Sequence, residues 1–398
     1  MILGFTEWSV GAIRDRSLLL RKRPDPEGGA LRRRCPIGRC LMVLVLCALA
    51  PQHGICGDPG VGRLAGRGAD ATAVSFNVSV LYATNRMYHP DRAMPERFGG
   101  ERGRPQYGRC QVSFTPIPVV NRLAEKFPFY VPSETDRLIA VEAADSPLFW
   151  EQLHEAVART TFRSVVVFVH GYNYGFERTC RMAAELQRDL AGAAAVVMFS
   201  WPANGRPTDY VMDLADVEWS MPFLAGFLNA LGDGLGRENV HLVAHSLGSR
   251  GVIQALGRLR ADQGEQAVMG RLVLLAPDFD SQTFVERLPR LLPQVARITL
   301  YASSNDTPLK ASRQLNGYPR LGEAGEFLTV VAGVETIDVS SVGRYQILGH
   351  EYFHYHPLVS ADLVRLLTRG DPAAQRPGLR ARTQGGMQYW EIRPTREP

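Results

Sequence analysis

Short continuous apolar runs alternate with longer segments of helical periodicity from about residue 137 onward. This alternation predicts buried strands joined by helices. The predicted strands are 138–143, 164–170, 194–200 and 240–244, and the predicted helices are 147–160, 176–190 and 210–231. Segments 271–276, 284–292, 297–302 and 336–339 continue the pattern, and a last helix is predicted over 357–367. Strands rich in Val, Ile and Leu need cover on both faces, so we predict an α/β fold with a mostly parallel central sheet between helices.

The two ends of this region have other patterns. Residues 75–84 alternate between apolar and polar, and a second strand is predicted near 107–114. These segments predict antiparallel strands at the sheet edge or over the site. The tail after residue 370 is rich in Pro, Arg and Gly and is predicted to be loose, apart from 387–392, which could add an edge strand. The sequence thus predicts one domain over 73–369, with N-terminal edge strands and loops over 73–136 and a C-terminal tail over 370–398.

An Arg-rich leader with an apolar segment of 11 residues at 40–50 precedes this domain. The apolar run is shorter than the roughly 20 residues of a membrane span and has the length of a signal-peptide core. Ala48-Leu49-Ala50 has the small-x-small pattern of a cleavage site, and the Gly-rich residues 51–72 predict a flexible linker. We therefore expect an exported protein, periplasmic or membrane-anchored through this segment. A cytoplasmic protein with a misassigned start is the alternative.

Charge argues against one class of partner. Residues 1–50 hold nine Arg or Lys and four Asp or Glu, and the rest of the chain holds 36 of each sign. Because phosphate binding requires a basic face, a neutral body argues against nucleic-acid binding. Four of the six cysteines lie in or beside the leader, and no spacing resembles a zinc site or a disulfide framework.

A candidate nucleophile lies between the strand 240–244 and the following helix. His245-Ser246 forms a polar corner there, and helical periodicity resumes at Val252. A sharp turn from strand to helix lifts a serine hydroxyl clear of the sheet and directs helix N–H groups at developing negative charge. The small residues Ala244 and Gly248 let strand and helix pass closely. The alternative is that Ser246 only caps the helix.

A serine nucleophile needs a base and an orienting acid. Asp306 follows the strand 297–302 and is the favoured acid, with Asp278 as the alternative; the other would be a helix cap or a loop brace. The favoured base is His350, in a Gly-His loop before the last helix, and His354 and His356 compete with it. These three histidines lack a carboxylate or Cys at metal-ligand spacing, so neither a metal nor an organic cofactor is predicted.

The remaining predicted parts stabilise and enclose the substrate. Two backbone N–H groups form an oxyanion hole in such sites. Leu247 directly follows the nucleophile, and Tyr172 follows His170-Gly171 after an apolar strand, so we predict their N–H groups as the donors. Trp201 and Tyr210 are predicted to line the pocket, although a Trp-Pro pair at a strand end could equally be packing.

Several motifs together resemble the bacterial α/β-hydrolases of unknown function within the esterase/lipase superfamily. The resemblance covers about 78–398 and implies a serine-hydrolase fold with Ser246 as nucleophile and His350 as base. The motifs are Leu81-Tyr-Ala-Thr-Asn-Arg86, Tyr107-Gly108, Val169-His-Gly-Tyr-Asn173, Ser200-Trp-Pro202, Ala244-His-Ser-Leu-Gly248, Ala276-Pro-Asp278, Tyr301-Ala-Ser-Ser-Asn-Asp306 and Gly349-His-Glu-Tyr352.

These features lead to the hypothesis of a serine esterase or lipase-like hydrolase acting on a small-molecule or lipid-like acyl ester. Two alternatives remain at this point. One is a hydrolase-like envelope protein that binds without turnover, and the other is an acyltransferase with the same triad.

Overall fold

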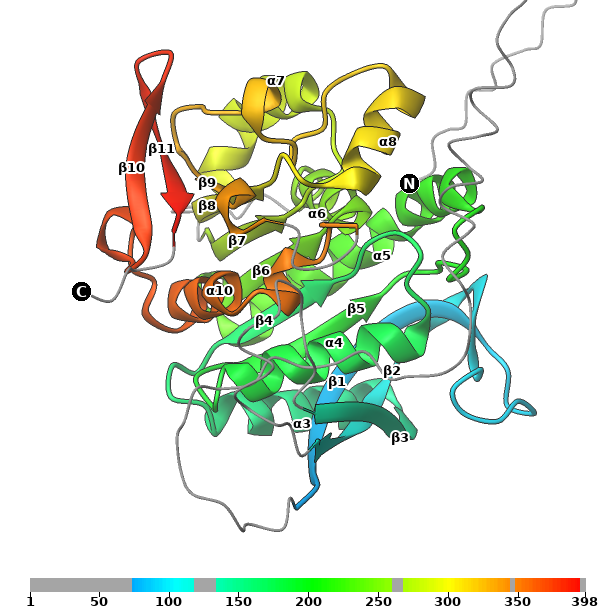
Figure 1. The fold of residues 1–398 in the computed structure, drawn as a ribbon. Coiled ribbons are helices and arrows are strands. Elements are labelled where there is room, and N and C mark those ends of the chain that lie inside the picture. The colour runs from blue at the N-terminus through cyan, green and yellow to red at the C-terminus, as the bar shows by residue number, and fades with distance from the viewer. Residues whose placement is uncertain (1–73, 118–133, 260–267, 344–347, 394–398) are drawn as a thin grey trace, which may run out of the picture. The chain divides into compact units, whose positions relative to one another are not determined.

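The computed structural model describes residues 74–117, 134–259, 268–343 and 348–393, and their main feature is an 11-stranded sheet. The predictions for the leader 1–50 and the linker 51–72 lie outside these residues. The strand order is β10-β11-β9-β8-β7-β6-β4-β5-β1-β2-β3 (Figure 1). The strands are β1 (Phe76–Tyr88), β2 (Phe98–Pro116), β3 (Glu134–Ala144), β4 (Val165–Val169), β5 (Ala195–Ser200), β6 (Val240–His245), β7 (Met269–Leu275), β8 (Val295–Ala302), β9 (Val334–Asp338), β10 (Leu379–Gln384) and β11 (Met387–Ile392).

The central strands pair in parallel from β1 through β5, β4, β6, β7, β8 and β9 to β11. This pairing confirms the mostly parallel sheet. Helices occupy most of the crossovers, as a parallel pair requires. The helices are α3 (Ser146–Ala158), α4 (Phe176–Asp189), α5 (Tyr210–Leu235), α6 (Leu247–Leu256), α7 (Ser281–Leu291), α8 (Thr307–Asn316), α9 (Tyr352–Tyr355) and α10 (Pro357–Arg369).

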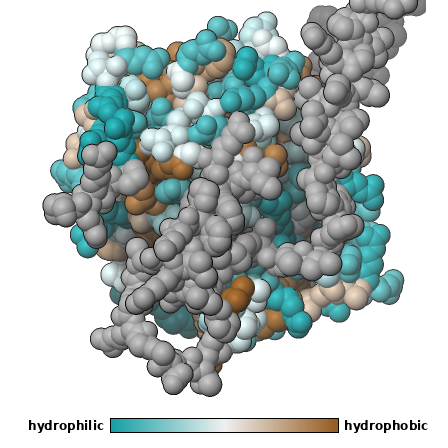
Figure 2. Space-filling view, in the orientation of Figure 1, coloured by the Kyte–Doolittle hydropathy of each residue, from teal (hydrophilic) through white to brown (hydrophobic). Residues whose placement is uncertain are grey.

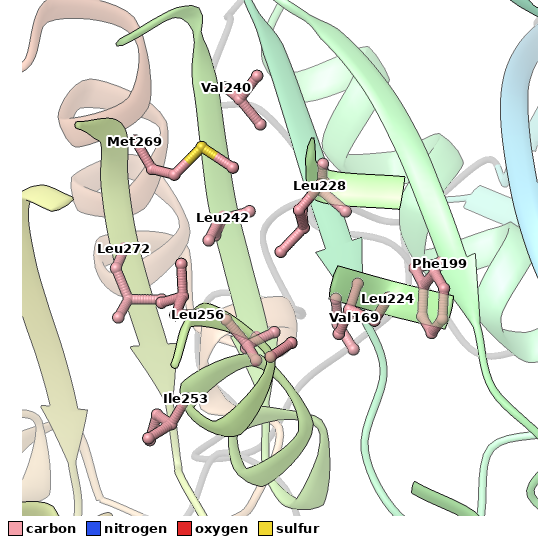
Figure 3. Packing of buried hydrophobic residues seen from close by; sticks show 14 of the residues in the cluster. Val169, Phe199, Leu224, Leu228, Val240, Leu242, Ile253, Leu256, Met269 and Leu272 are labelled. Carbon is pink, nitrogen blue, oxygen red and sulfur yellow. The ribbon is translucent and has the colours of Figure 1, made fainter. Parts of the chain in front are cut away.

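Two apolar layers, one on each face of the sheet, explain why the strands are apolar at every position. On β4, Val165, Val167 and Val169 pack into one layer with α3, α5, α6 and α7. Val166 and Phe168 point to the other layer, which α4, α9 and α10 cover. Figure 3 shows Val169, Leu242 and Leu224 of the first layer between sheet and helices. Successive side chains on a strand face opposite sides, so cover on both faces requires continuous apolar runs.

The N-terminal strands differ in part from the prediction. β1 pairs antiparallel with β2, and β2 with β3, as expected of edge strands, but β1 itself is interior and parallel to β5. β3, which contains the predicted strand 138–143, forms the antiparallel edge instead of the first parallel strand. Chain direction in a sheet depends on how strands are connected, and the apolar pattern of a single strand does not carry that information.

The C-terminal tail is part of the sheet. Residues 387–392 form a strand as predicted, but β11 lies inside the sheet beside β9, and β10 is the edge. Gly385 and Gly386, both at positive φ, form the two-residue turn between β10 and β11. Upstream of the hairpin, Arg376 is buried against Asp362, with 2.8 Å between Nη1 and Oδ2. The Gly-Gly turn was the sequence signal for this hairpin.

The described surface is predominantly polar on the face shown in Figure 2, where hydrophobic residues form small groups among hydrophilic ones. None of the helices in the described parts of the chain combines the length and apolar character needed to cross a membrane. Cys110 and Cys180 are buried and unbridged.

Candidate active site

Ser246 lies at the turn between β6 and α6, at the carboxyl end of a central strand. Its backbone has φ 51° and ψ −122°, which few non-glycine residues adopt. Neighbouring strands hold this strained turn: the Ser246 N–H donates to Leu275 O at 2.9 Å, and its carbonyl accepts from the Asp278 N–H at 3.1 Å. A strained residue that its surroundings fix so firmly is typical of a functional position.

Close packing at this turn explains the small residues around it. A Cβ on Gly248 would lie 2.3 Å from His170 O, so only glycine lets α6 pass this close to the end of β4. A Cβ on Gly171 would lie 2.7 Å from Ser246 Cβ and 2.9 Å from His245 Nδ1. The loop 170–175, which we call the oxyanion loop, therefore lies directly against the candidate nucleophile.

Asp306 and His350 form a hydrogen-bonded pair, with 2.7 Å between Asp306 Oδ2 and His350 Nδ1. Because an ionised carboxylate only accepts hydrogen bonds, Nδ1 carries the proton and Nε2 is left as an acceptor. The second oxygen, Asp306 Oδ1, accepts from the Leu309 N–H at 2.9 Å and caps α8. Gly349 has φ 65°, and a Cβ there would lie 2.6 Å from Asn305 O, so the Gly-His pair brings the two loops into contact.

The Asp306–His350 pair lies against His245, the neighbour of Ser246 in sequence. His245 is the residue before Ser246, and its ring centroid lies 4.7 Å from that of His350. Burial has the largest effect and lowers the pKa of His350, but the carboxylates of Asp306, Glu351 and Asp278 together raise it, and the net pKa lies above the ordinary value. For His245 the effect of burial dominates and holds its pKa well below the ordinary value. His350 is thus the histidine at this corner that a carboxylate orients.

Asp278, the alternative acid, braces other parts of the fold. Arg320 Nε donates to Asp278 Oδ1 at 2.7 Å, and the Ser312 hydroxyl donates to the same oxygen at 2.7 Å. The Tyr210 hydroxyl donates to Asp278 Oδ2 at 2.8 Å. These contacts match the loop brace that was one of the two roles predicted for the other aspartate. The helix caps are Asp280 at α7 and Asp306 at α8.

The other two candidate bases have partners away from this corner. His354 forms an ion pair with the buried Glu185 of α4. His356 caps α10, with 3.3 Å between its Nδ1 and the Leu358 nitrogen. Within the described residues, no cluster of three or more His, Cys, Asp or Glu side chains is arranged to hold a metal ion.

The two predicted oxyanion donors belong to the two segments next to Ser246, α6 and the oxyanion loop. Leu247 is the first residue of α6, and the N–H groups of a first helical turn have no partner within the helix. Tyr172 lies in the oxyanion loop, where Asp213 Oδ2 accepts from the Asn173 N–H at 3.0 Å. Asn173 has φ 64°. Burial raises the pKa of Asp213 to about 6.

The two predicted pocket residues, Trp201 and Tyr210, differ in their exposure. Trp201 is fully buried, so it does not line an open pocket. Its ring stacks on His170 at 4.7 Å between centroids, and its Nε1 donates to His170 O at 2.9 Å. Packing was therefore the right interpretation for Trp201. Tyr210 is partly buried beside Tyr172, with 5.4 Å between ring centroids.

A buried ion pair joins the base loop to α4, and sequence reasoning missed it. Glu351, the residue after His350, accepts a hydrogen bond from the Tyr174 hydroxyl. Arg178 Nη2 lies 2.5 Å from Glu351 Oε1. Burial raises the pKa of Glu351, but Arg178 and Tyr174 outweigh that effect and lower it to about 2. The Glu in the motif Gly349-His-Glu-Tyr352 was a hint, because its charge would need a partner if buried, but the sequence does not say which residue supplies that partner.

Comparison with known proteins gives a family and several distant likenesses. A family described as "Alpha/beta hydrolase of unknown function (DUF900)" matches residues 148–369. An uncharacterized protein from Nostoc sp. strain PCC 7120 is 24% identical over an alignment of 196 residues, which covers 42% of this chain and 50% of that protein. The chain thus spans about half the length of this curated relative.

Two solved esterases illustrate the distant structural likenesses. An esterase from Thermogutta terrifontis with propionate bound is 13% identical with a TM-score of 0.28, covering 52% of this chain and 82% of its own. An esterase from Pyrobaculum calidifontis is 10% identical with a TM-score of 0.25, covering 84% and 77% respectively. The family match extends from α3 to the end of α10 and includes Ser246, Asp306 and His350. The chain belongs to the family of alpha/beta hydrolases of unknown function (DUF900).

Proposed function

We propose that this protein is a serine hydrolase that cleaves a carboxylic ester, with Ser246 as nucleophile, His350 as base and Asp306 as orienting acid. The observation that carries the proposal is the 2.7 Å contact between Asp306 and His350, whose ring lies against that of His245, the residue before a serine at φ 51°. An imidazole that a carboxylate orients and a strained serine at a strand end are the parts that nucleophilic catalysis requires.

The first half of the reaction forms an acyl-enzyme. His350 Nε2 takes the proton of Ser246 Oγ as that oxygen bonds to the ester carbonyl carbon. The N–H groups of Tyr172 and Leu247 stabilise the negative oxygen of the tetrahedral intermediate. The bond to the alcohol oxygen then breaks, and His350 gives its proton to the departing alcohol. Asp306 keeps the ring in the required tautomer and stabilises the imidazolium.

In the second half, water replaces the alcohol. His350 takes a proton from the water as its oxygen attacks the acyl carbon, and returns that proton to Ser246 when the acid departs. Entry of a different acceptor at this step would give acyl transfer. Small-molecule or lipid-like acyl esters are the substrates we propose.

The test compares the full chain with its Ser246→Ala variant on p-nitrophenyl esters from acetate to palmitate, together with labelling by a fluorophosphonate. We expect both hydrolysis and labelling in the wild type and neither in the variant, which should fold because only the hydroxyl is removed. Labelling without ester hydrolysis would mean another acyl substrate or acceptor. A wild type that shows neither activity would overturn the proposal in favour of a binding protein.

We also propose that the apolar segment 40–50 directs export, on the basis of its length and its Ala48-Leu49-Ala50 pattern. A reporter enzyme that is active only after export, fused after residue 72, tests this. An inactive reporter with an intact leader would favour the cytoplasmic alternative.

A further inference from the structure

Arg86, at the carboxyl end of β1, is fully buried among neutral acceptors. Within the described residues, its guanidinium forms no ion pair with a carboxylate. Burial lowers the pKa of Arg86 to about 10, so the side chain is still charged at neutral pH. A charge buried without a direct counter-ion is costly, and the steps proposed above do not yet account for it.

One side of the guanidinium holds the end of β5 and the loop after it. Nε donates to Ser200 Oγ at 2.8 Å, and Nη1 donates to Ala203 O at 2.8 Å. Nη1 also donates to Gly99 O at 3.1 Å. These contacts fix the guanidinium plane against three separate segments.

The other side holds the oxyanion loop. Nη2 donates to Tyr174 O at 2.7 Å and lies 3.3 Å from His170 Nε2. The same ring contacts two backbone carbonyls, with 2.8 Å between Nδ1 and Gly171 O and 3.1 Å between Nε2 and Trp201 O. Arg86 thus contacts the loop on both sides of Tyr172, the predicted oxyanion donor.

Asp213 of α5 carries the opposite charge and binds the same loop. Its Oδ2 accepts from the Asn173 N–H at 3.0 Å, and its Oδ1 accepts from the Asn204 N–H at 3.3 Å. Asn173 donates its N–H to Asp213, and the adjacent residue Tyr174 offers its carbonyl to Arg86. The two buried charges therefore bind successive residues of the loop backbone instead of each other.

We propose that Arg86 and Asp213 are positioning residues that hold the oxyanion loop, so that the Tyr172 N–H points at the oxyanion formed on Ser246. This inference rests on the proposed function. A loop backbone that is held from both sides does not need to rearrange during the reaction. An oxyanion hole is most effective when its donors are already in place in this way.

The test uses Arg86→Gln, Arg86→Lys and Asp213→Asn in the full chain. Arg376→Gln is the control, because Arg376 is equally buried but pairs with Asp362 and Glu335 beyond the site. For Arg86→Gln and Asp213→Asn we expect kcat and the affinity for a trifluoromethyl ketone to fall together by about 10²-fold, with KM within about threefold. For Arg86→Lys, kcat and the affinity for the ketone should lie between those of wild type and Arg86→Gln. The double variant should lose less than the product of the two single losses, because both act on one loop.

Hydrogen exchange of the peptide 170–176 separates failure of this inference from failure of the proposed function. We expect exchange to be faster than wild type in the Arg86 and Asp213 variants and unchanged in Arg376→Gln, whether or not the protein turns over an ester. Folded variants with wild-type exchange and wild-type kcat would overturn the inference. If Arg86→Gln does not fold, Asp213→Asn decides it by the same two measurements. An inactive wild type with altered exchange in the variants would contradict only the proposed function.

Discussion

Replacing Asp306 and Asp278 separately by asparagine should separate catalysis from stability. The Asp306→Asn variant keeps a side-chain oxygen for the Leu309 cap, since Asn and Asp cap helices about equally well. It removes the charge beside His350 and offers an N–H to Nδ1, which favours the tautomer that cannot accept the serine proton. Stabilising the wrong tautomer costs on the order of 10⁴-fold in kcat. That factor corresponds to about 5.4 kcal/mol of transition-state stabilisation.

The Asp278→Asn variant should have the opposite profile. Arg320 is 3% exposed and would lose its charged partner, which costs about 3–5 kcal/mol of folding free energy. Because Asp278 does not contact His350, kcat of the folded fraction should remain within about tenfold of wild type, a loss of at most ~1.4 kcal/mol. Turnover of p-nitrophenyl butyrate, or the best ester of the panel, and urea unfolding followed by circular dichroism measure the two quantities. A folded Asp306→Asn protein with more than a tenth of wild-type kcat, beside a folded but inactive Asp278→Asn protein, would refute the assignment.

Three further predictions concern neighbouring residues. The acidic limb of the kcat/KM profile should lie above pH 6.5, since His350 must be neutral and its pKa is raised. It should move to lower pH in Asp306→Asn, because the carboxylate that raises the pKa of His350 most is lost. Gly171→Ala places a Cβ 2.7 Å from Ser246 Cβ and should lower kcat by about 10²-fold, whereas Gly175→Ala, with open space around it, should stay within about threefold in the same ester assay. Glu351 has a folded pKa of about 2, so wild type should lose stability as pH falls from 4.5 towards 2. That loss should reach about 3 kcal/mol and be absent from Glu351→Gln in urea unfolding at each pH, and equal pH slopes for the two proteins would contradict it.

The regular part of the fold could be predicted because the residues of both apolar layers recur in the sequence at the spacing of strands and helices. Each strand and helix from β4 to β8 was predicted. The helix α8 was not, because its apolar face is short and its N-cap, Asp306, was interpreted first as a triad residue. The order Ser246, Asp306, His350 could be predicted because each follows a strand. The preference for Asp306 over Asp278 stayed open in the sequence, because it depends on which aspartate meets His350 in space.

The supporting contacts of the site could not be predicted. Tyr174 and Glu351 are 177 residues apart in sequence, and Arg86 and Ser200 are 114 apart. A lone Arg in a strand or a Glu beside a His carries no periodic signal of its partner. Only the folded chain shows that these residues surround the predicted oxyanion loop.

The open sheet has consequences for self-association. Among the described strands, β10 and β3 form the two edges of the sheet, and strand edges are templates for aggregation. β10 is only six residues long and carries Arg380 and Arg382, while β3 carries the exposed Arg137 and Glu142. A second β10 alongside would bring Arg380 and Arg382 of both molecules close together, and like charges on neighbouring strands repel. The arginines of this hairpin thus help to keep an open sheet from growing between molecules.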